Sequence, residues 1–192
     1  QALHDANILH RDLKPLNILL GENDEPMVAD FGLAKWLDET DSDYTHSGMP
    51  IGTRQYMAPE QTQGARAGYS RACDVWAVGV TLFEVLAGHR PFPEDDDADL
   101  AEHIRTSDFP DVPGVPPPLL AVVRKCLAKN PADRYPSAAA VADDLERWLG
   151  GTLVPPAAPP GPRRRWSGGR VAALVLAGVA IATGVYVATR DR

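Results

Sequence analysis

The residues best suited to chemistry lie in three short motifs. Residues 10–17 read HRDLKPLN, residues 30–32 read DFG and residues 58–60 read APE. An isolated Asp or Asn in a loop is commonly an ordinary turn residue. Three motifs in this order, holding carboxylate, amide and ammonium side chains, are far more specific than any one of them. They suit chemistry that depends on positioning and charge stabilisation more than on covalent bonds to the protein.

The three motifs resemble the catalytic loop, the metal-binding motif and the A-P-E motif of protein kinases. The resemblance is specifically to bacterial eukaryotic-like, receptor-type serine/threonine kinases, and it covers about residues 1–150. It implies an α+β protein-kinase-like fold, of which this chain holds the mostly α-helical C-terminal lobe without the N-terminal lobe. The implied function of the parent protein is ATP-dependent phosphorylation of serine and threonine on protein substrates, including its own activation loop, in transmembrane signalling.

The resemblance also implies roles for individual side chains. Asp12 accepts or orients the proton of the substrate hydroxyl, and Lys14 contacts the γ-phosphate that is transferred. Asn17 and Asp30 are the implied ligands of Mg²⁺, so the implied cofactors are ATP and Mg²⁺. A lysine two residues after the catalytic aspartate is typical of serine/threonine kinases.

Other motif residues have implied structural roles. His10 and Phe31 belong to the apolar spine that aligns the two lobes in this family. Gly32 suits a backbone position that changes conformation. Asp74, in the run CDVW at residues 73–76, resembles a buried helix aspartate that holds the backbone of the catalytic loop by hydrogen bonds.

Glu60 and Arg134 resemble a buried ion pair that links the A-P-E segment of kinases to their late helices. Such a pair is weak evidence for net stability, but removal of one partner costs about 3–5 kcal/mol because the other charge stays buried. Both residues are therefore interpreted as structural support.

Regulation is implied by residues around and after the catalytic loop. Arg11, directly before Asp12, marks kinases whose activation loop is commonly ordered by phosphorylation, because a phosphate brings about −2 charge that arginine binds. Thr45 and Ser47 lie at positions that resemble the autophosphorylation sites of bacterial relatives. The alternative is that hydroxyl groups are simply common in exposed loops. Thr53 resembles a threonine that contacts the catalytic Asp and Lys, and is interpreted as architectural.

Part of a kinase nucleotide site is not found in the chain. A kinase needs a Gly-rich loop, a strand lysine and a helix glutamate, all before the catalytic loop. Only nine residues precede His10, and no G-x-G-x-x-G occurs. We expect a fragment that is essentially inactive alone. The alternative is a catalytically inactive, membrane-tethered kinase-lobe scaffold, and the intact Asp12, Asn17 and Asp30 argue against it.

The elements expected around these motifs are a hairpin and several helices. Residues 18–20 and 27–29, on either side of a turn-like segment, predict a short hairpin that places Asn17 and Asp30 close together. Residues 33–57 read as one long loop. Helices are predicted over residues 70–87, 97–106, 117–128 and 137–149, with Ser137 as an N-cap.

Charge and cysteine content restrict the possible partners. Residues 1–150 hold 13 Lys/Arg and 25 Asp/Glu, a net charge of −12, whereas residues 151–192 hold six Arg and one Asp, a net charge of +5. The acidic part argues against nucleic acid as a partner. The basic tail suits an anionic membrane surface. Cys73 and Cys126 stand alone in apolar helical patterns and are interpreted as reduced core thiols of a cytosolic domain.

The C-terminal residues predict a membrane anchor. Residues 151–170 are a Pro- and Arg-rich juxtamembrane linker, and residues 171–189 hold no charged side chain. Nineteen residues give a helix of about 28 Å at ~1.5 Å per residue, close to the ~30 Å of a hydrocarbon core. A buried core helix is the alternative, but only three residues follow to build a domain around it.

Flanking residues predict how this anchor is oriented. Residues 163–165 and Arg170 are basic and precede the apolar run, and this modest bias predicts a cytoplasmic kinase domain. The whole is predicted to be a single-pass protein of the cell membrane. Gly178 and Ala182, four residues apart, are a weak signal for a homodimer face.

Overall fold

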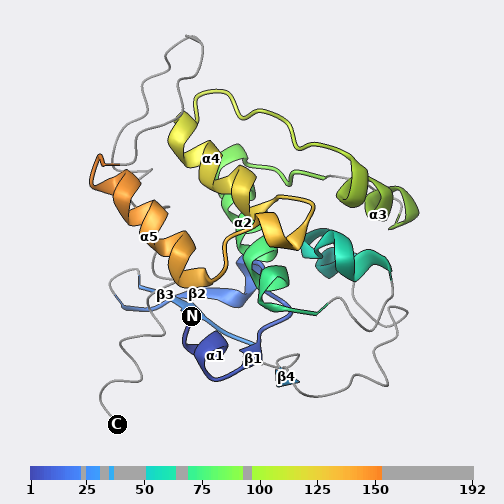
Figure 1. Ribbon diagram of the computed structural model, residues 1–192, viewed down its shortest axis with the longest axis horizontal. Coiled ribbons are helices and arrows are strands. Elements are labelled where there is room, and N and C mark those ends of the chain that lie inside the picture. The colour runs from blue at the N-terminus through green and yellow to red at the C-terminus, as the bar shows by residue number, and fades with distance from the viewer. Residues whose placement is uncertain (23–24, 31–34, 37–50, 64–68, 93–96, 153–192) are drawn as a thin grey trace.

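The computed structural model describes residues 1–22, 25–30, 35–36, 51–63, 69–92 and 97–152. Figure 1 shows helices α2, α4 and α5 gathered together, with α1 and the short strands near one end of α2. The elements, with η for a 3-10 helix, are α1 (Ala2–Asp5), β1 (Ile8–Leu9), η1 (Pro15–Asn17), β2 (Ile18–Leu20), β3 (Pro26–Val28), β4 (Lys35–Trp36), η4 (Ile51–Tyr56), η5 (Pro59–Gln63), α2 (Arg71–Ala87), α3 (Asp97–Thr106), α4 (Pro117–Cys126), η6 (Pro131–Asp133) and α5 (Ala138–Leu149).

Helix α2 is the centre of the fold because it is apolar on nearly every side. A helix that is hydrophobic all round belongs in a core, and most of the side chains of α2 are buried, including Trp76 and Phe83 at 0% exposure. The Oγ of Ser70 caps its N-terminus by accepting a hydrogen bond from the N–H of Ala72 (3.3 Å). Gly88, with φ of 77°, ends the helix in the left-handed conformation that glycine adopts most easily.

Helices α4 and α5 cover one side of α2. Pro117 starts α4, where the missing N–H of proline costs nothing. Ser137 caps α5 through a hydrogen bond from the N–H of Ala140 to its Oγ (3.1 Å), as the sequence predicted. Leu119, Val123 and Leu145 have almost no exposed surface, so both helices turn their apolar faces to the common core.

Helix α3 lies on the far side of the molecule from α5 (Figure 1). Polar contacts hold it there. Arg105 donates from Nη1 to Oγ1 of Thr62 in η5 (3.4 Å). The Nζ of Lys129 donates to the carbonyl oxygen of Ile104 (2.7 Å), one of the last carbonyls of α3, and lies 4.5 Å from the ring centroid of Phe92. A cation at this position satisfies an unpaired carbonyl at the helix C-terminus.

The hairpin expected from the sequence is present. Strands β2 and β3 pair antiparallel, with Ile18 opposite Val28 and Leu20 opposite Pro26. The N–H of Ala29 donates to the carbonyl oxygen of Asn17 (2.8 Å), which extends the pairing beyond the ladder. The ends of the two strands therefore bring Asn17 next to the residue that precedes Asp30.

The single loop expected over residues 33–57 is wrong for two segments. Residues 35–36 form β4, which pairs with β1 through Ile8 opposite Trp36. Residues 51–56 form η4. Both were missed because a two-residue strand depends on a partner far away in the sequence and a short 3-10 helix leaves no clear periodic pattern. The predicted helix over residues 117–128 ends earlier, at Cys126.

Several sequence predictions lie outside the described residues. The apolar run over residues 171–189 and nearly all of the linker belong to this group. Among the residues that are described, no helix is long and apolar enough to cross a membrane. Cys73 and Cys126 are both buried thiols that form no disulfide bond in the structure, in agreement with their interpretation as core residues.

Candidate active site

Asp74 holds the catalytic loop in place from the first turn of α2. Its carboxylate accepts hydrogen bonds from the backbone N–H of His10 (3.0 Å, Oδ2) and the backbone N–H of Arg11 (3.0 Å, Oδ1). A buried carboxylate is stable only if hydrogen bonds replace the water it has lost. Because backbone N–H groups supply two of those bonds, burial of Asp74 fixes the path of the chain just before Asp12.

His4 supplies a third hydrogen bond to Asp74, a role that no motif of the sequence indicated. Its Nε2 lies 2.8 Å from Oδ2 of Asp74, and its side chain is buried. Its other ring nitrogen, Nδ1, is buried without a hydrogen-bond partner among the described residues. An acceptor without a partner costs less than a charged donor without one. Because Nε2 faces the carboxylate oxygen, we assign a proton to Nε2, which donates to Asp74.

Arg71 fixes the segment that carries His4. Its Nη2 donates to the carbonyl oxygen of His4 (2.6 Å) and to Oδ1 of Asn7 (2.7 Å). Arg71 is the first residue of α2, so the same helix end holds both the α1 segment and the catalytic loop. Arg71 lies three residues before Asp74, so the sequence places both on the same face of a helix. That spacing does not indicate the partners of Arg71, which lie more than 60 positions earlier in the chain.

Asp12 is held by two side chains of its own loop. Lys14 donates from Nζ to Oδ2 of Asp12 (2.7 Å). Asn17 donates from Nδ2 to the same oxygen (3.0 Å) and to the backbone carbonyl oxygen of Asp12 (2.8 Å). The other carboxylate oxygen, Oδ1, is buried and has no hydrogen-bond partner in the described part of the chain. It is thus the oxygen of this carboxylate whose capacity to accept a hydrogen bond is unused within the described residues.

Asn17 and Asp30 offer oxygen atoms on neighbouring strand ends. The Nδ2 group of Asn17 is used by Asp12, which leaves its amide oxygen as the group that can bind a cation. Asp30 is exposed and follows β3 directly. Carboxylate and amide oxygens are the ligands that Mg²⁺ takes in proteins, together with water and phosphate oxygens. The residues present therefore fit the expected metal ion.

Two residues of the site have an unusual backbone conformation. Arg11 has φ of 69° and Asp30 has φ of 63°. Residues other than glycine rarely adopt this left-handed backbone region, because it costs them about 1 kcal/mol or more. Such strain persists where surrounding contacts hold it and is common at functional sites. For Arg11 the holding contact is the hydrogen bond from its N–H to Asp74.

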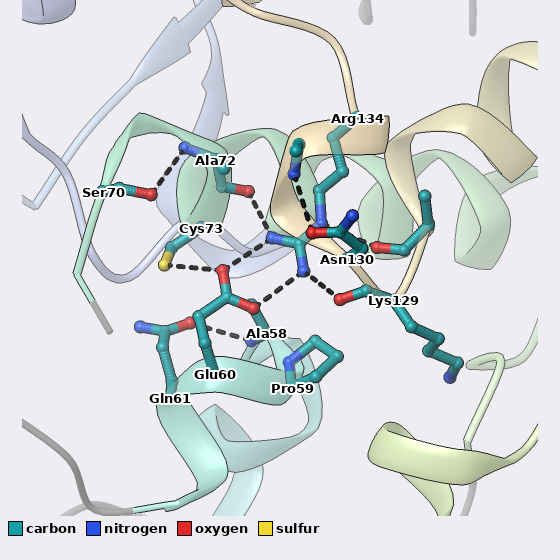
Figure 2. Close-up of polar contacts among 12 residues, drawn as sticks. Ala58, Pro59, Glu60, Gln61, Ser70, Ala72, Cys73, Lys129, Asn130 and Arg134 are labelled. Atoms are coloured by element: carbon teal, nitrogen blue, oxygen red, sulfur yellow. Dashed lines mark hydrogen bonds and ion pairs between the residues drawn. The ribbon is translucent and has the colours of Figure 1, made fainter. Parts of the chain in front are cut away.

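Glu60 and Arg134 form a bidentate ion pair, shown in Figure 2. Nη1 of Arg134 lies 2.7 Å from Oε1 of Glu60, and Nη2 lies 2.7 Å from Oε2. The remaining donors of Arg134 bind the carbonyl oxygens of Ala72 (2.9 Å), Ala128 (2.8 Å) and Lys129 (3.1 Å). One side chain therefore ties η5 to α2 and to the segment after α4.

Cys73, in the first turn of α2, forms a hydrogen bond to the carboxylate of Glu60. Its Sγ donates to Oε1 of Glu60 (3.3 Å), as Figure 2 shows. Burial raises the pKa of the Cys73 thiol to about 12, and the nearby charge of Glu60 acts in the same direction. The thiol therefore stays protonated and remains a donor to Glu60.

The protein kinase domain family model matches residues 1–145. The chain belongs to the protein kinase family. It is 40% identical over 148 residues to serine/threonine-protein kinase PknB of Mycolicibacterium smegmatis, covering 75% of this chain and 23% of that protein. It is 39% identical over 160 residues to PknB of Mycobacterium tuberculosis, covering 81% and 25%. It is 37% identical over 166 residues to PknL of Mycobacterium tuberculosis, covering 84% and 41%. The chain spans about a quarter of the length of the PknB relatives.

The kinase fold brings together some predicted site residues. Asp12, Lys14 and Asn17 share hydrogen bonds, and the backbone N–H of Ala29, the residue before Asp30, is hydrogen-bonded to Asn17. His10 is buried, and its Nε2 lies 3.3 Å from the carbonyl oxygen of Ala29. The catalytic and metal-binding roles stay predictions.

Other predicted kinase residues cannot be placed. Phe31, Gly32, Thr45 and Ser47 lie outside the described residues. For Thr53 only the backbone is described, as part of η4.

Proposed function

We propose that the protein to which this chain belongs is an ATP-dependent serine/threonine protein kinase. The observation that carries the proposal is the carboxylate of Asp12, whose Oδ2 is held by Lys14 and Asn17 while its buried Oδ1 has no hydrogen-bond partner in the described residues. Membership of the protein kinase family and the similarity to PknB and PknL support the choice of reaction and of acceptor.

In the proposed phosphoryl transfer, each residue of the site has a separate role. Asp12 accepts a hydrogen bond from the serine or threonine hydroxyl of a protein substrate and takes its proton as the new O–P bond forms. The bond from the γ-phosphorus to the oxygen of ADP breaks in the same reaction. Lys14, next to Asp12, places a positive charge where the transferred phosphoryl group passes.

Asn17 and Asp30 are the residues that would hold Mg²⁺. When bound, Mg²⁺ neutralises the negative charge of the ATP phosphates. The two hydrogen bonds that Asn17 donates to Asp12 fix the position of one side chain relative to the other. A scaffold without catalytic activity would have no use for this arrangement, so the geometry favours the kinase over that alternative.

Substitution of Asp12 in the full-length protein tests the proposed function. Asp12→Asn removes the proton acceptor and keeps the size of the side chain, so we expect transfer of labelled phosphate from ATP to a protein substrate to fall about 10²–10⁴-fold. The matched control is Asp143→Asn, at an exposed position of α5, with transfer within about twofold of the unsubstituted protein. Unchanged transfer by Asp12→Asn would contradict the proposed mechanism.

We further propose that phosphorylation of Thr45 or Ser47 activates the kinase through Arg11. Support comes from the position of Arg11, whose backbone is fixed by Asp74 directly beside Asp12. A phosphate on the loop would attract the guanidinium group and order the chain around the catalytic aspartate.

We also propose that residues 171–189 cross the cell membrane once, with the kinase domain in the cytoplasm. Support comes from the uncharged apolar run and the arginines that precede it. The small residues Gly178 and Ala182 of this run are a proposed contact in a homodimer.

A further inference from the structure

Lys129 joins the end of helix α3 to two aromatic rings, and none of these contacts has a part in the proposed phosphoryl transfer. Its Nζ donates to the carbonyl oxygen of Ile104, in the last turn of α3 (2.7 Å). The same atom lies 4.5 Å from the ring centroid of Phe92 and 5.3 Å from that of Trp76. The two rings are nearly parallel, with centroids 6.1 Å apart. The ammonium group is therefore held at one place in the fold.

The charge of Lys129 has no carboxylate partner in the part of the chain that the structure describes. Within that part, one carbonyl oxygen is the only hydrogen-bond acceptor for its three N–H groups. A half-buried charge with so few partners is costly. Two charged residues act on it from neighbouring segments, namely Asp108, two residues after α3, and Arg134, directly after η6.

These surroundings favour the neutral amine. Burial lowers the pKa of the Lys129 ammonium to about 8, and the charge of Arg134 adds to this shift while that of Asp108 opposes it. About a tenth of the molecules therefore carry a neutral amine at pH 7, compared with less than about a thousandth for an ordinary lysine. The side chain is also partly exposed, so that another molecule can reach it.

A neutral lysine amine is a nucleophile toward activated acyl groups. Nζ attacks the carbonyl carbon of an acyl phosphate or an acyl thioester, and the new C–N bond forms. The bond from that carbon to the phosphate oxygen or to the sulfur breaks, and phosphate or thiolate leaves with its electron pair. The nitrogen gives one proton to water. The product is an uncharged amide.

We propose that Lys129 is an acylation site, and that its modification loosens the end of helix α3. An amide has no positive charge, so its attraction to the faces of Phe92 and Trp76 and to the C-terminal end of α3 is lost. The acyl group must also find room beside Phe92, which is buried. The contact of Arg105 with Thr62 in η5 is then left to hold α3.

Acetylation of the full-length protein tests the site. Acetyl phosphate is added in one arm and acetyl coenzyme A in the other, and mass spectrometry measures the rate of modification of each lysine. The matched control is Lys125, in the last turn of α4, whose Nζ also lies over a ring, that of Tyr135 (4.1 Å), but whose side chain is exposed. We expect Lys129 to react about tenfold faster than Lys125 at pH 7 in at least one arm. That arm identifies the acyl donor, and a rate no greater than that of Lys125 in both arms would overturn the proposed site.

Hydrogen exchange of α3 tests the consequence of the modification. Lys129→Gln carries an uncharged amide, as acylated lysine does, whereas Lys129→Arg keeps the positive charge. We expect backbone exchange over residues 100–106 to become about tenfold faster in the acetylated protein and in Lys129→Gln, and to stay within about twofold in Lys129→Arg.

The acetylated, unsubstituted protein gives the comparison if Lys129→Gln does not fold. Equal exchange before and after acetylation would overturn the proposed effect on α3. Neither measurement depends on phosphate transfer, so failure of this inference is distinguishable from failure of the proposed function.

Discussion

Asp74 shows how one buried charge organises the candidate site. The two carboxylate oxygens receive donors from His4, His10 and Arg11, which lie more than 60 positions earlier in the chain. A carboxylate without such donors would be too costly to bury. The need to satisfy Asp74 therefore decides the backbone conformation that presents Asp12.

Substitution of His4 tests whether its hydrogen bond to Asp74 matters for catalysis. His4→Leu leaves Asp74 with one donor fewer, at a cost of about 1–3 kcal/mol. Since the catalytic loop is bound to Asp74, we expect kcat of the full-length protein to fall about tenfold while KM for ATP changes little. Steady-state kinetics with a protein substrate give both values.

A conservative variant is the control for this prediction. Gln has an N–H donor at a similar distance from the backbone as Nε2 of histidine, so His4→Gln should recover kcat to within about threefold of the unsubstituted protein. Equal loss of kcat in the Gln and Leu variants would show that the size of the imidazole matters and the hydrogen bond does not.

At the scale of elements, the contact between α2 and α4 depends on the absence of a side chain at Gly79. A Cβ atom added there would lie 2.5 Å from the Cβ of Cys126 and 3.1 Å from Cδ2 of Leu127. The first contact involves an atom fixed to the backbone of α4, which cannot turn away. Glycine is unfavourable inside a helix by about 1 kcal/mol relative to alanine, so here close packing has outweighed helix propensity.

Gly79→Ala should destabilise the protein in spite of the better helix propensity of alanine. We expect the free energy of unfolding to fall by about 1–3 kcal/mol, because α2 and α4 must move apart. Urea unfolding of the full-length protein measures this change. Gly150→Ala is the matched control, since a Cβ at this position meets its nearest atom, the carbonyl oxygen of Glu146, at 3.4 Å. It should change stability by less than about 0.5 kcal/mol.

A second substitution tests the cause. Cys126→Gly removes the Cβ atom that the methyl group introduced by Gly79→Ala would meet, so it should cost less in the Gly79→Ala background than alone. Strict additivity of the two changes in unfolding free energy would mean that this contact is not the source of the destabilisation.

At the scale of the whole molecule, the chain has two parts of opposite charge. Residues 1–150 are acidic and residues 151–192 are basic and apolar. The kinase family model ends at residue 145, close to that change. We propose that the basic linker holds the acidic kinase domain near an anionic membrane surface without the domain lying on it.

Membrane attachment can be tested by fractionation of cells that make the full-length protein. Because residues 171–189 are predicted to span the bilayer, the protein should stay in the membrane pellet after alkaline carbonate treatment. Replacement of Val179 and Ile181 by Lys should release it, since each lysine costs about 2.5–3.5 kcal/mol at the centre of a membrane helix. Release of the unsubstituted protein by carbonate would contradict the predicted span.

Local patterns predicted much of the fold. The helices at residues 97–106 and 137–149 and the cap at Ser137 follow from spacing and capping, which act within a few residues. The hairpin that joins Asn17 to the neighbourhood of Asp30 also follows from a short-range signal. By contrast, β4 depends on pairing with β1, about 27 positions earlier, and no local sequence pattern indicates that pairing.

The candidates for chemistry could be named from the sequence, because Asp12, Lys14, Asn17 and Asp30 lie in motifs that are recognised over a few residues. Family resemblance also indicated the pair of Glu60 and Arg134. The support of the catalytic loop by His4 and Arg71, and the contact of Lys129 with Ile104, emerged only from the folded chain. Burial of Asp74 and the closure of α1 onto α2 join residues more than 55 positions apart, and such contacts leave no periodicity in the sequence.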